Sequence, residues 1–385
     1  MRKYRVIAIF LLICVFINSF IFRSYAAPLA GETDLSLDCR SAILIEANTG
    51  EVLYEMNADE ALPPASVTKI MTLLLVMEAI DEGRLLLTDT VTASANACSM
   101  GGSQIFLKEG ERMSVEDMLK SVVIASANDA AVALAEHIAG TETAFVSLMN
   151  KKARELGLLS TNFENTNGLD DTVENHVSSA RDIAIMSREL IKHKKILEYS
   201  SIWMDTIRNG DFGLTNTNRL VRFYKGATGL KTGSTAKAKF CVSATAERDG
   251  MSLICVIMAA PTRDIRNAAA TALLDYGFSN YSLYRGSGKV SEMVKVLGGV
   301  KSECLLRDLE FCKVVKKSEL SKITFEVELP SSVSAPVSVG DKLGRCVYRY
   351  EDSVIGESDI VATESVEKIN FLGLLLRMLA KMVAC

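Results

Sequence analysis

The chain has few of the residues from which metal sites and disulfide frameworks are built. Its three histidines show no ligand spacing, so the sequence predicts no zinc site. None of its nine cysteines belongs to a Cys-x-x-Cys pair. Cys304 and Cys312 could pair, but no disulfide framework is evident, and a chain of 385 residues that is 49% hydrophobic can build a core without one. Cys241 and Cys255 fall in apolar strands, where we interpret them as small hydrophobic residues.

Basic residues are also too few for a nucleic-acid-binding surface. The chain has 43 Lys and Arg against 47 Asp and Glu, a net charge of −4. Residues 1–26 contain four of the cations and no acidic residue, so a chain without them would have a net charge of −8. No basic patch interleaved with aromatic residues is present. We therefore expect no nucleic-acid partner.

The first 26 residues have the pattern of a secretory signal peptide. Three cations within the first five residues precede an apolar run over Val6–Phe22. Ser24-Tyr25-Ala26 then supplies the small-x-small pattern of a cleavage site, which indicates cleavage after Ala26. The alternative is an uncleaved membrane anchor. The small residues at the expected site favour removal.

After this segment, residues 27–285 alternate between strand and helix patterns, as in a mixed α/β domain. Asp249-Gly250 is a strong hairpin turn between two apolar strands. Ser114 begins a capping box at the start of a helix. The other expected elements are hairpin strands over Ser41–Glu46 and Glu51–Met56, a helix over Ile70–Ile80, strands over Phe240–Glu247 and Met251–Ala260, and a helix over Arg263–Tyr276 that Gly277 ends.

Two further parts complete the chain. Over residues 287–366, alternating Val, Ser and Lys with recurrent Pro and Gly turns predict a small β-rich domain. Residues 368–385 are too short to span a bilayer, which takes about 20 residues. Their polar residues form one stripe at helical spacing, at Asn370, Gly373, Arg377 and Lys381. This pattern favours an amphipathic helix in the membrane interface over the alternative, a helix packed on its own domain.

The segment Ser66-Val67-Thr68-Lys69 could supply a nucleophile and its base. A proline pair precedes Ser66 and the nearly all-apolar segment Ile70–Ile80 follows it, so we expect a buried helix to carry both residues at its start. Residues three apart lie on one helix face, and free N–H groups at a helix start can hold an oxyanion. Burial and a second cation could lower the pKa of Lys69 enough for it to accept a proton. Alone the motif is weak, because Ser-x-x-Lys recurs at 234–237 and 365–368 without a buried helix.

Two further motifs strengthen this interpretation. Lys231-Thr232-Gly233 occurs once, and Leu230 rather than glycine precedes the lysine, which excludes a phosphate-binding loop. Beside a serine nucleophile, this lysine and hydroxyl would suit a carboxylate, and Gly233 would let a substrate backbone approach closely. Ser-x-Asn occurs at 94–96, 126–128 and 160–162. Only the second lies between two good helices, and we expect the others to be turn or cap residues.

In this order, Ser-x-x-Lys, Ser-x-Asn and Lys-Thr-Gly are the signature set of penicillin-binding proteins and class A β-lactamases. Over nearly all of its length the chain resembles the low-molecular-mass penicillin-binding proteins, which are serine-type D-alanyl-D-alanine carboxypeptidases of the peptidase S11 family. The other segments that carry the resemblance are Gly101-Gly102-Ser103, Ser126–Ala130, Asn167-Gly168-Leu169, Ser179–Asp182, Thr228–Gly233, the turn Pro336–Asp341 and the amphipathic tail.

The resemblance implies a catalytic role for three residues. Ser66 would attack the carbonyl between the two terminal D-alanines of a peptidoglycan stem pentapeptide. Lys69 would be the general base, and Ser126 would relay protons to the leaving amine. Water would then hydrolyse the acyl-enzyme without any metal or cofactor. Penicillin and other β-lactams would acylate Ser66 and inhibit the enzyme.

The resemblance also implies substrate-binding roles. Different residues would bind the substrate's amide and its terminal carboxylate. Lys231, one of the carboxylate ligands, would also lower the pKa of Lys69. Backbone N–H groups would form an oxyanion hole worth roughly 3–4 kcal/mol per donor. The residues so implied are Asn128 for the amide, Lys231, Thr232 and Arg266 for the carboxylate, Gly233 for backbone approach, and the N–H groups of Ser66 and Ser234 for the oxyanion.

The implied fold is of the α/β (α+β) class. It has a β-lactamase/transpeptidase-like domain with a five-stranded antiparallel sheet flanked by helices, then the small β-rich domain and the tail helix. With such a leader and tail, the protein would be exported to the outer face of the bacterial cytoplasmic membrane. It would act there in cell-wall biogenesis and cell shape, with the peptidoglycan stem peptide, β-lactams and the membrane surface as partners.

This sequence departs from the family pattern at a few positions. Ser234 stands where a bulkier residue is common, and Thr228 where an acidic one is common. Ala236-Lys237-Ala238-Lys239 carries more charge than we expect in the strand after the motif. These differences concern substrate preference and rate rather than the chemical class.

Two alternative functions share the fold. A β-lactamase needs an acid that activates water, and Glu164 is the only candidate in the right region, but its loop matches the carboxypeptidase pattern around Asn167-Gly168. The β-rich domain and the tail also argue against a β-lactamase. The second alternative is a catalytically weak wall-binding scaffold, against which the presence of every motif residue argues.

Overall fold

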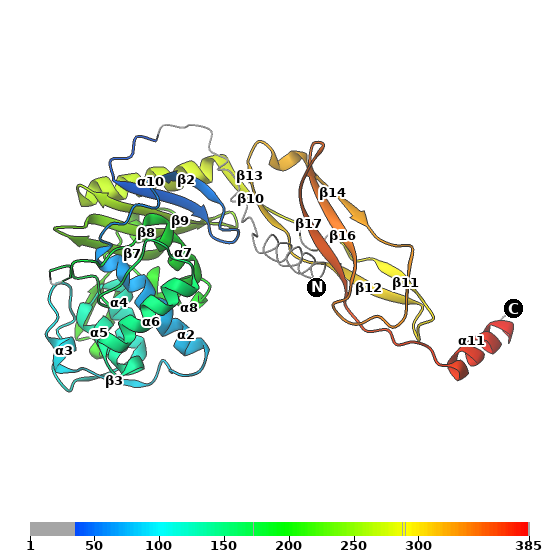
Figure 1. Cartoon of the computed structure of the whole chain (residues 1–385), viewed down its shortest axis with the longest axis horizontal. Helices are drawn as coiled ribbons and strands as arrows, with labels where there is room; N and C mark the ends of the chain where they lie inside the picture. Colours follow the sequence, from blue (N-terminus) through cyan, green and yellow to red (C-terminus); the bar gives the residue numbers. More distant parts are fainter. Residues whose placement is uncertain (1–34, 172, 287, 289, 384–385) are drawn as a thin grey trace, which may run out of the picture.

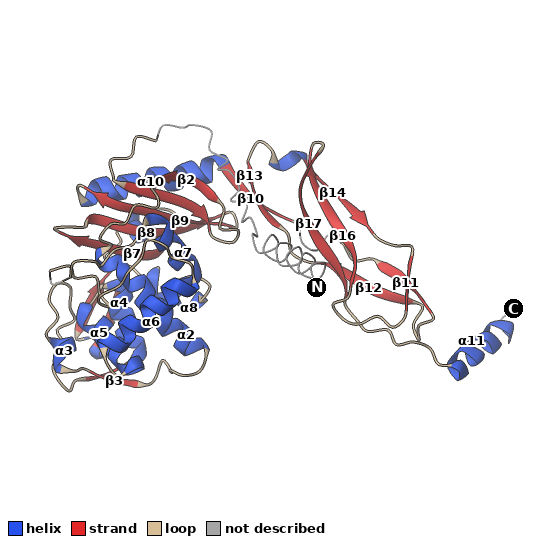
Figure 2. Ribbon diagram, in the orientation of Figure 1, coloured by secondary structure: helices blue, strands red, loops and turns tan. Residues whose placement is uncertain are grey.

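The computed structural model describes residues 35–171, 173–286, 288 and 290–383. The expected signal peptide over residues 1–26 lies outside the described residues. Figure 1 shows a large mixed unit, a second unit made of strands, and a helix at the C-terminal end of the chain. The predicted α/β architecture and the β-rich C-terminal part are both present (Figure 2).

A five-stranded antiparallel sheet organises the large unit, as the sequence predicts. Its strand order is β2-β1-β9-β8-β7. The central strands are buried on both faces and are rich in Val, Ile, Leu, Cys and Ala, which explains their nearly continuous apolar runs. The strands are β1 (Ser41–Glu46), β2 (Val52–Met56), β7 (Ala227–Thr235), β8 (Lys239–Arg248) and β9 (Met251–Ala260).

Alternate residues of each strand point to opposite faces of the sheet, and each face packs against its own helices. On β1, Ile43 and Ile45 belong to the core shared with the helical region, whereas Ala42 and Leu44 pack toward α10 (Arg263–Asn280). The sheet therefore separates α10 from the helices that pack in the core of Ile43 and Ile45 (Figure 1).

The predicted end of α10 at Gly277 is wrong, because the helix continues to Asn280. Gly277 lies inside the helix where it crosses the sheet. A Cβ at this position would lie 2.6 Å from a methyl of Leu253 and 2.8 Å from one of Leu44. The glycine thus allows close packing of the helix on the sheet and does not end it.

The helical region carries most of the motifs. As predicted, Ser114 caps α4 by accepting a hydrogen bond from the Asp117 N–H at 3.1 Å, and Ser94 caps α3 in the same way. The elements of this region are η1 (Ala65–Thr68), α2 (Lys69–Asp81), β3 (Thr90–Thr92), α3 (Ala95–Cys98), β4 (Arg112–Ser114), α4 (Val115–Ile124), α5 (Asn128–Ala139), α6 (Glu142–Glu155), α7 (Ala180–Leu190), α8 (Lys194–Ser200), β5 (Met204–Ile207), η2 (Arg208–Gly210), β6 (Phe212–Thr215) and α9 (Leu220–Phe223).

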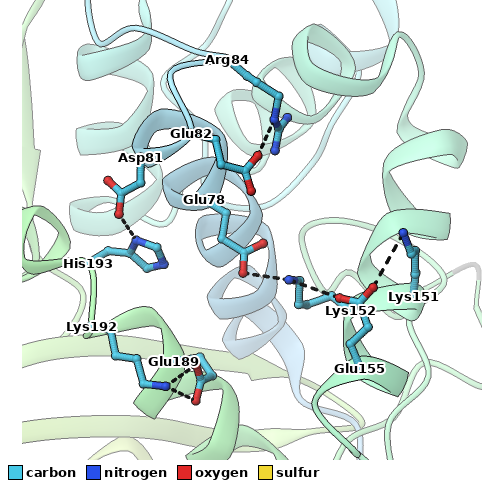
Figure 3. A network of polar contacts seen from close by, with 10 residues as sticks. All are labelled: Glu78, Asp81, Glu82, Arg84, Lys151, Lys152, Glu155, Glu189, Lys192 and His193. Carbon is cyan, nitrogen blue, oxygen red and sulfur yellow. Dashed lines mark hydrogen bonds and ion pairs between the residues drawn. The ribbon is translucent and has the colours of Figure 1, made fainter. Parts of the chain in front are cut away.

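Helix α2 is held at its C-terminal end by polar side-chain contacts (Figure 3). Acidic residues at this end oppose the helix dipole, and the Lys152 cation offsets the charge of one of them. Glu78 pairs with Lys152 of α6 at 2.8 Å, and Asp81 contacts His193 at 2.5 Å. These contacts tie α2 to two neighbouring elements at the end opposite Ser66.

The second unit contains a six-stranded sheet of order β14-β16-β17-β12-β11-β15, and β10 pairs with β13 beside it. Tyr348 lies at the centre of its core and stacks on Phe311 with ring centroids 4.2 Å apart. The elements are β10 (Tyr281–Arg285), β11 (Met293–Leu297), β12 (Glu303–Asp308), β13 (Cys312–Lys316), η3 (Leu320–Lys322), β14 (Ile323–Glu328), β15 (Ser332–Ser334), β16 (Lys342–Tyr350) and β17 (Ser353–Ala362).

The cysteines of the described residues are free thiols, so Cys304 and Cys312 form no disulfide. Cys241 and Cys255 are buried in β8 and β9, as predicted for small apolar residues. Burial raises the pKa of the Cys241 thiol to about 11, so this cysteine stays protonated at neutral pH.

The tail forms helix α11 (Phe371–Val383), which lies beyond the β-rich unit in Figure 1. Arg377 donates hydrogen bonds to the carbonyl oxygens of Gly299, at 3.1 Å, and Val300. Among the described residues, no helix is long and apolar enough to cross a bilayer. Large apolar side chains of α11 are exposed, at Phe371, Leu372, Leu374, Leu375, Leu376, Met378, Leu379 and Met382.

Candidate active site

Ser66 lies in η1, a single 3₁₀ turn that precedes α2, and not in the α-helix itself as the sequence suggested. Proline at 63 and 64 prevents an earlier helix start, and the turn passes directly into α2 at Lys69. The three-residue spacing still brings the side chains together, with Lys69 Nζ 2.8 Å from Ser66 Oγ. Lys69 is fully buried, whereas Ser66 is half-buried and reaches the cleft.

The surroundings of Lys69 favour a neutral amine. Burial, and then the charge of Lys231, hold the pKa of Lys69 well below its usual range. Besides Ser66 Oγ, its Nζ contacts Asn128 Oδ1 at 2.6 Å and the Asn167 carbonyl oxygen at 2.8 Å. A neutral amine has two N–H donors and one lone pair. The two oxygens that can only accept take the N–H groups, so the lone pair faces the Ser66 hydroxyl.

The amide of Asn128 has a fixed orientation. Its Nδ2 donates to the Gly101 carbonyl oxygen at 2.7 Å, so its oxygen must face Lys69. In this structure both ends of the amide are thus engaged within the protein. The amide nitrogen has a second N–H, so it can donate to a ligand carbonyl without loss of the Gly101 contact.

Lys231 is the second buried amine of the site. Its Nζ donates to Ser126 Oγ at 2.8 Å and to the Thr232 carbonyl oxygen at 2.9 Å. Burial, and then Arg266, lower its pKa to about 7. Ser126 has a φ of +62°, a strained conformation for a residue with a side chain. Such strain is typical of functional residues, and here it orients the hydroxyl toward Lys231.

Arg266 and Thr232 provide further donors next to the two amines. Arg266 is buried, and its Nη1 contacts the Cys241 carbonyl oxygen at 3.3 Å. Burial, and then Arg263, lower the pKa of Arg266 to about 10, so it remains a cation at neutral pH. The hydroxyl of Thr232 lies 2.9 Å from that of Thr217. Together these groups form a cationic, donor-rich wall that suits a carboxylate.

Two glycines allow backbone segments to approach the nucleophile turn. Gly168 has a φ of +84°, and a Cβ there would overlap the carbonyl oxygen of Ala65. A Cβ at Gly233 would lie 2.8 Å from the Ser66 backbone nitrogen. Thr72 Oγ1 donates to the Thr166 carbonyl at 2.6 Å and fixes the loop that carries Gly168 and the Lys69 acceptor at Asn167.

A cavity of about 310 Å³ opens over Ser66. All nine residues predicted from the sequence meet here: six line the cavity, and Lys69, Asn128 and Lys231 are hydrogen-bonded at its floor. No aspartate or glutamate is among the lining residues. They are Ser66, Ser103, Ser126, Trp203, Asn216, Thr217, Arg219, Thr232, Gly233, Ser234, Arg263 and Arg266.

Sequence reasoning missed one wall of this cavity. Asn216 and Thr217 lie in an asparagine-rich segment, and this composition is the one signal in the sequence that marks them. Asn216 Nδ2 donates to the Ser200 and Ile202 carbonyls and so fixes the chain beside the cleft. Trp203, Arg219 and Arg263 had no motif to distinguish them. Within the described part of the chain, no group of three or more His, Cys, Asp or Glu residues could hold a metal ion.

The acid that a β-lactamase would need is not in the cavity. Glu164 is exposed, does not line the cleft, and accepts a hydrogen bond from the Asn175 N–H at 2.9 Å.

Lys237, one of the unexpected charges after Lys-Thr-Gly, reaches from the turn between β7 and β8 to the Asp170 carbonyl at 2.6 Å. It therefore fastens the loop that also carries Gly168.

Two family models match most of the chain. The D-alanyl-D-alanine carboxypeptidase model of peptidase family S11 matches residues 28–262, and the model of the penicillin-binding protein 5 C-terminal domain matches residues 278–368. The first match contains every motif residue except Arg266.

Whole-chain comparisons give similar results. The chain is 44% identical to the D-alanyl-D-alanine carboxypeptidase DacF of Bacillus subtilis over 353 residues, an alignment that covers 90% of both chains. It is 34% identical to the D-alanyl-D-alanine carboxypeptidase DacC of Escherichia coli over 370 residues, which is 92% of both chains. Its structure resembles penicillin-binding protein 5 from Haemophilus influenzae with a TM-score of 0.74, at 31% identity over 88% of this chain and all of the other. It also resembles penicillin-binding protein D2 from Listeria monocytogenes in its ampicillin-bound form, with a TM-score of 0.59 at 33% identity over 64% of this chain and all of the other.

Proposed function

Because the chain belongs to the D-alanyl-D-alanine carboxypeptidase family, we propose that Ser66 is the nucleophile with which it removes the terminal D-alanine from peptidoglycan stem pentapeptides. The protein is a serine-type D-alanyl-D-alanine carboxypeptidase. The observation that carries the assignment of Ser66 is the set of three contacts made by the buried Lys69 amine, which leave its lone pair for the Ser66 hydroxyl.

Acylation begins when Ser66 Oγ attacks the carbonyl carbon of the penultimate D-alanine. Lys69 Nζ takes the hydroxyl proton, and the N–H groups of Ser66 and Ser234 stabilise the oxyanion, each worth roughly 3–4 kcal/mol. The tetrahedral intermediate then collapses and the C–N bond breaks. Ser126, which is hydrogen-bonded to Lys231, passes a proton to the departing D-alanine amine and regains one from the Lys69 ammonium, so Lys69 is neutral again. An ester on Ser66 remains.

Deacylation repeats these steps with water as the nucleophile. Lys69 takes a proton from the water, whose oxygen bonds to the ester carbon. The ester C–O bond then breaks, Ser66 Oγ regains the proton from Lys69, and the shortened peptide leaves with a new carboxylate. During acylation, Thr232 and Arg266 hold the terminal carboxylate of the substrate, and the charge of Lys231 adds to their attraction. Gly233 admits the peptide backbone, and the second Nδ2–H of Asn128 donates to the carbonyl of the substrate amide while the first stays on Gly101.

Intact-protein mass spectrometry tests this proposal directly. After incubation with benzylpenicillin, we expect one stable adduct of the mass of the drug, and peptide mapping should locate it on Ser66. The ampicillin-bound relative supports such a complex. The same preparation should release D-alanine from a pentapeptide. Rapid penicillin turnover without a lasting adduct would instead favour a β-lactamase, and labelling without D-alanine release would favour a scaffold.

We also propose that the enzyme is exported and held at the outer face of the cytoplasmic membrane by α11. The exposed apolar side chains of this helix support the proposal, because a soluble protein rarely leaves such a patch uncovered. Arg377, through its hydrogen bonds to the Gly299 and Val300 carbonyls, would tie α11 to the β-rich unit while the apolar side chains enter the membrane interface. Membrane binding would keep the catalytic domain close to newly made peptidoglycan.

Deletion of residues 368–385 is expected to release the enzyme from membranes without loss of D-alanine release. Sedimentation with anionic phospholipid vesicles measures the first effect and peptide hydrolysis the second. As a control, Leu159→Ser removes a side chain that is 93% exposed on the catalytic unit, and it should leave sedimentation unchanged. Persistent sedimentation of the truncated protein would contradict membrane binding through α11.

A further inference from the structure

The cavity continues past the groups that hold the terminal carboxylate. Thr217 contacts Thr232, and Arg263 lies one helical turn before Arg266, so both flank the proposed carboxylate site. Trp203 and Arg219 line the same cavity. In the proposed reaction the leaving residue carries the terminal carboxylate. The wall formed by Trp203, Thr217, Arg219 and Arg263 therefore adjoins the leaving residue.

This wall carries more positive charge than a leaving D-alanine can neutralise. A terminal D-alanine has one carboxylate, which Arg266 and Lys231 already match. Among the described residues, Arg219 has only the ring of Phe223 as a partner, at 5.6 Å from the guanidinium carbon, and Arg263 has no ion pair or hydrogen bond through its side chain. The cavity lining offers them no carboxylate.

The position of Arg263 does not serve the stability of the fold. It is the first residue of α10, where the helix dipole disfavours a cation, and it lies close enough to Arg266 to lower the pKa of that buried residue. Asp264 in the same turn suits the helix dipole, so Arg263 is the residue of this turn whose charge opposes it, and such a local cost is typical of functional sites. An anionic ligand between Arg219 and Arg263 would offset both costs.

Trp203 supplies an apolar surface next to these cations. Its ring packs edge-on against Phe223 at 6.3 Å, and the Arg222 guanidinium covers it at 5.4 Å. These contacts keep the indole fixed where it lines the cavity. Such a wall suits the methylene groups of a side chain that ends in a charged group.

We propose that Trp203, Arg219 and Arg263 form a subsite for an acidic side chain on the leaving residue. The enzyme would then release a terminal D-glutamate, and not only D-alanine, from stem-type peptides. The bond chemistry is unchanged: the amide C–N bond breaks, water supplies the hydroxyl to the acyl carbon, and the amine of the released residue gains a proton. This inference rests on the proposed function of Ser66 and adds a substrate class to it.

Three peptides that differ only in the last residue test the subsite: one ends in D-glutamate, one in the uncharged isostere D-glutamine, and one in D-alanine. We expect kcat/KM to be about tenfold or more higher for D-glutamate than for D-glutamine, since hydrogen bonds to charged groups contribute more than neutral ones. Arg219→Gln and Arg263→Gln should each reduce this ratio several-fold. Arg154→Gln, the same change at an exposed arginine of α6 outside the cavity lining, is the matched control and should keep it.

Equal cleavage of the D-glutamate and D-glutamine peptides, or a ratio that neither arginine variant lowers, would overturn the subsite. The D-alanine peptide separates the two proposals. If D-alanine is released and the ratio is one, only the subsite is wrong. If no D-alanine is released, the carboxypeptidase assignment of Ser66 fails. Comparison of D-glutamate with D-glutamine within each variant cancels any general loss of activity.

Discussion

Replacement of Lys69 by arginine is expected to slow penicillin acylation by at least about 10³-fold, nearly as much as Ser66→Ala, which should abolish it. Arginine keeps a positive charge and hydrogen-bond donors at this position but cannot give up its proton in a protein. It would therefore satisfy Asn128 and the Asn167 carbonyl without offering Ser66 a lone pair. Stopped-flow acylation measures the rate, and release of D-alanine reports on the complete reaction.

The control is Lys151→Arg, the same change at an exposed lysine of α6, which should leave the rate unchanged. The free energy of unfolding of each variant should also be measured, to separate chemistry from misfolding. A folded Lys69→Arg variant with acylation within tenfold of the wild-type rate would contradict a base role for Lys69.

The pH dependence of the wild-type enzyme follows from the same residue. Because the folded pKa of Lys69 lies well below its usual value, the amine is largely neutral above that pKa and charged below it. The acylation rate should therefore fall tenfold per pH unit on the acid side of this pKa. An ordinary lysine would place this limb near pH 10.

Gly168→Ala is expected to have the second-largest effect. The new Cβ would overlap the Ala65 carbonyl, a backbone group that cannot move away like a flexible side chain. Either the nucleophile turn or the loop with Asn167 must shift, and the Lys69 contacts depend on both. We expect loss of several kcal/mol of stability and at least a 10²-fold lower acylation rate, since small misplacements of reacting groups cost this much.

Gly140→Ala is the matched control for this substitution. Gly140 has a φ of +82°, almost equal to the +84° of Gly168, but no atom lies within 4 Å of its added Cβ. It should lose only about 1 kcal/mol from backbone strain and should keep its acylation rate. If the two variants behave alike, conformation rather than close approach explains the glycine at 168.

The active-site residues could be predicted from the sequence because the residue types of each motif indicate the chemistry that they perform. Ser66 and Lys69 are linked by helical spacing, and the order of the three motifs restricts the family. Segments as distant as Ser126 and Lys231 meet in the structure through a single 2.8 Å hydrogen bond, which no local pattern encodes. The resemblance supplied that long-range information.

Other features could not be predicted because they depend on tertiary contacts. The 3₁₀ turn at Ser66 follows from close packing of Gly168 and Gly233 on the chain around it. Gly277 looks like a helix end in the sequence, yet its position is explained by methyl groups of Leu44 and Leu253. Arg219 is exposed and Trp203 half-buried, both lie at unpatterned positions, and only the fold brings them to the cleft.

Helix α10 acts as a rod that connects two remote contacts. Its 18 residues span about 27 Å, with Arg266 near one end and Gly277 near the other. Any added bulk at Gly277 would tilt this rod away from the sheet and move the guanidinium at the opposite end. The position of the guanidinium proposed to bind the leaving residue thus depends partly on how closely Gly277 packs against Leu44 and Leu253, far from any bond that breaks.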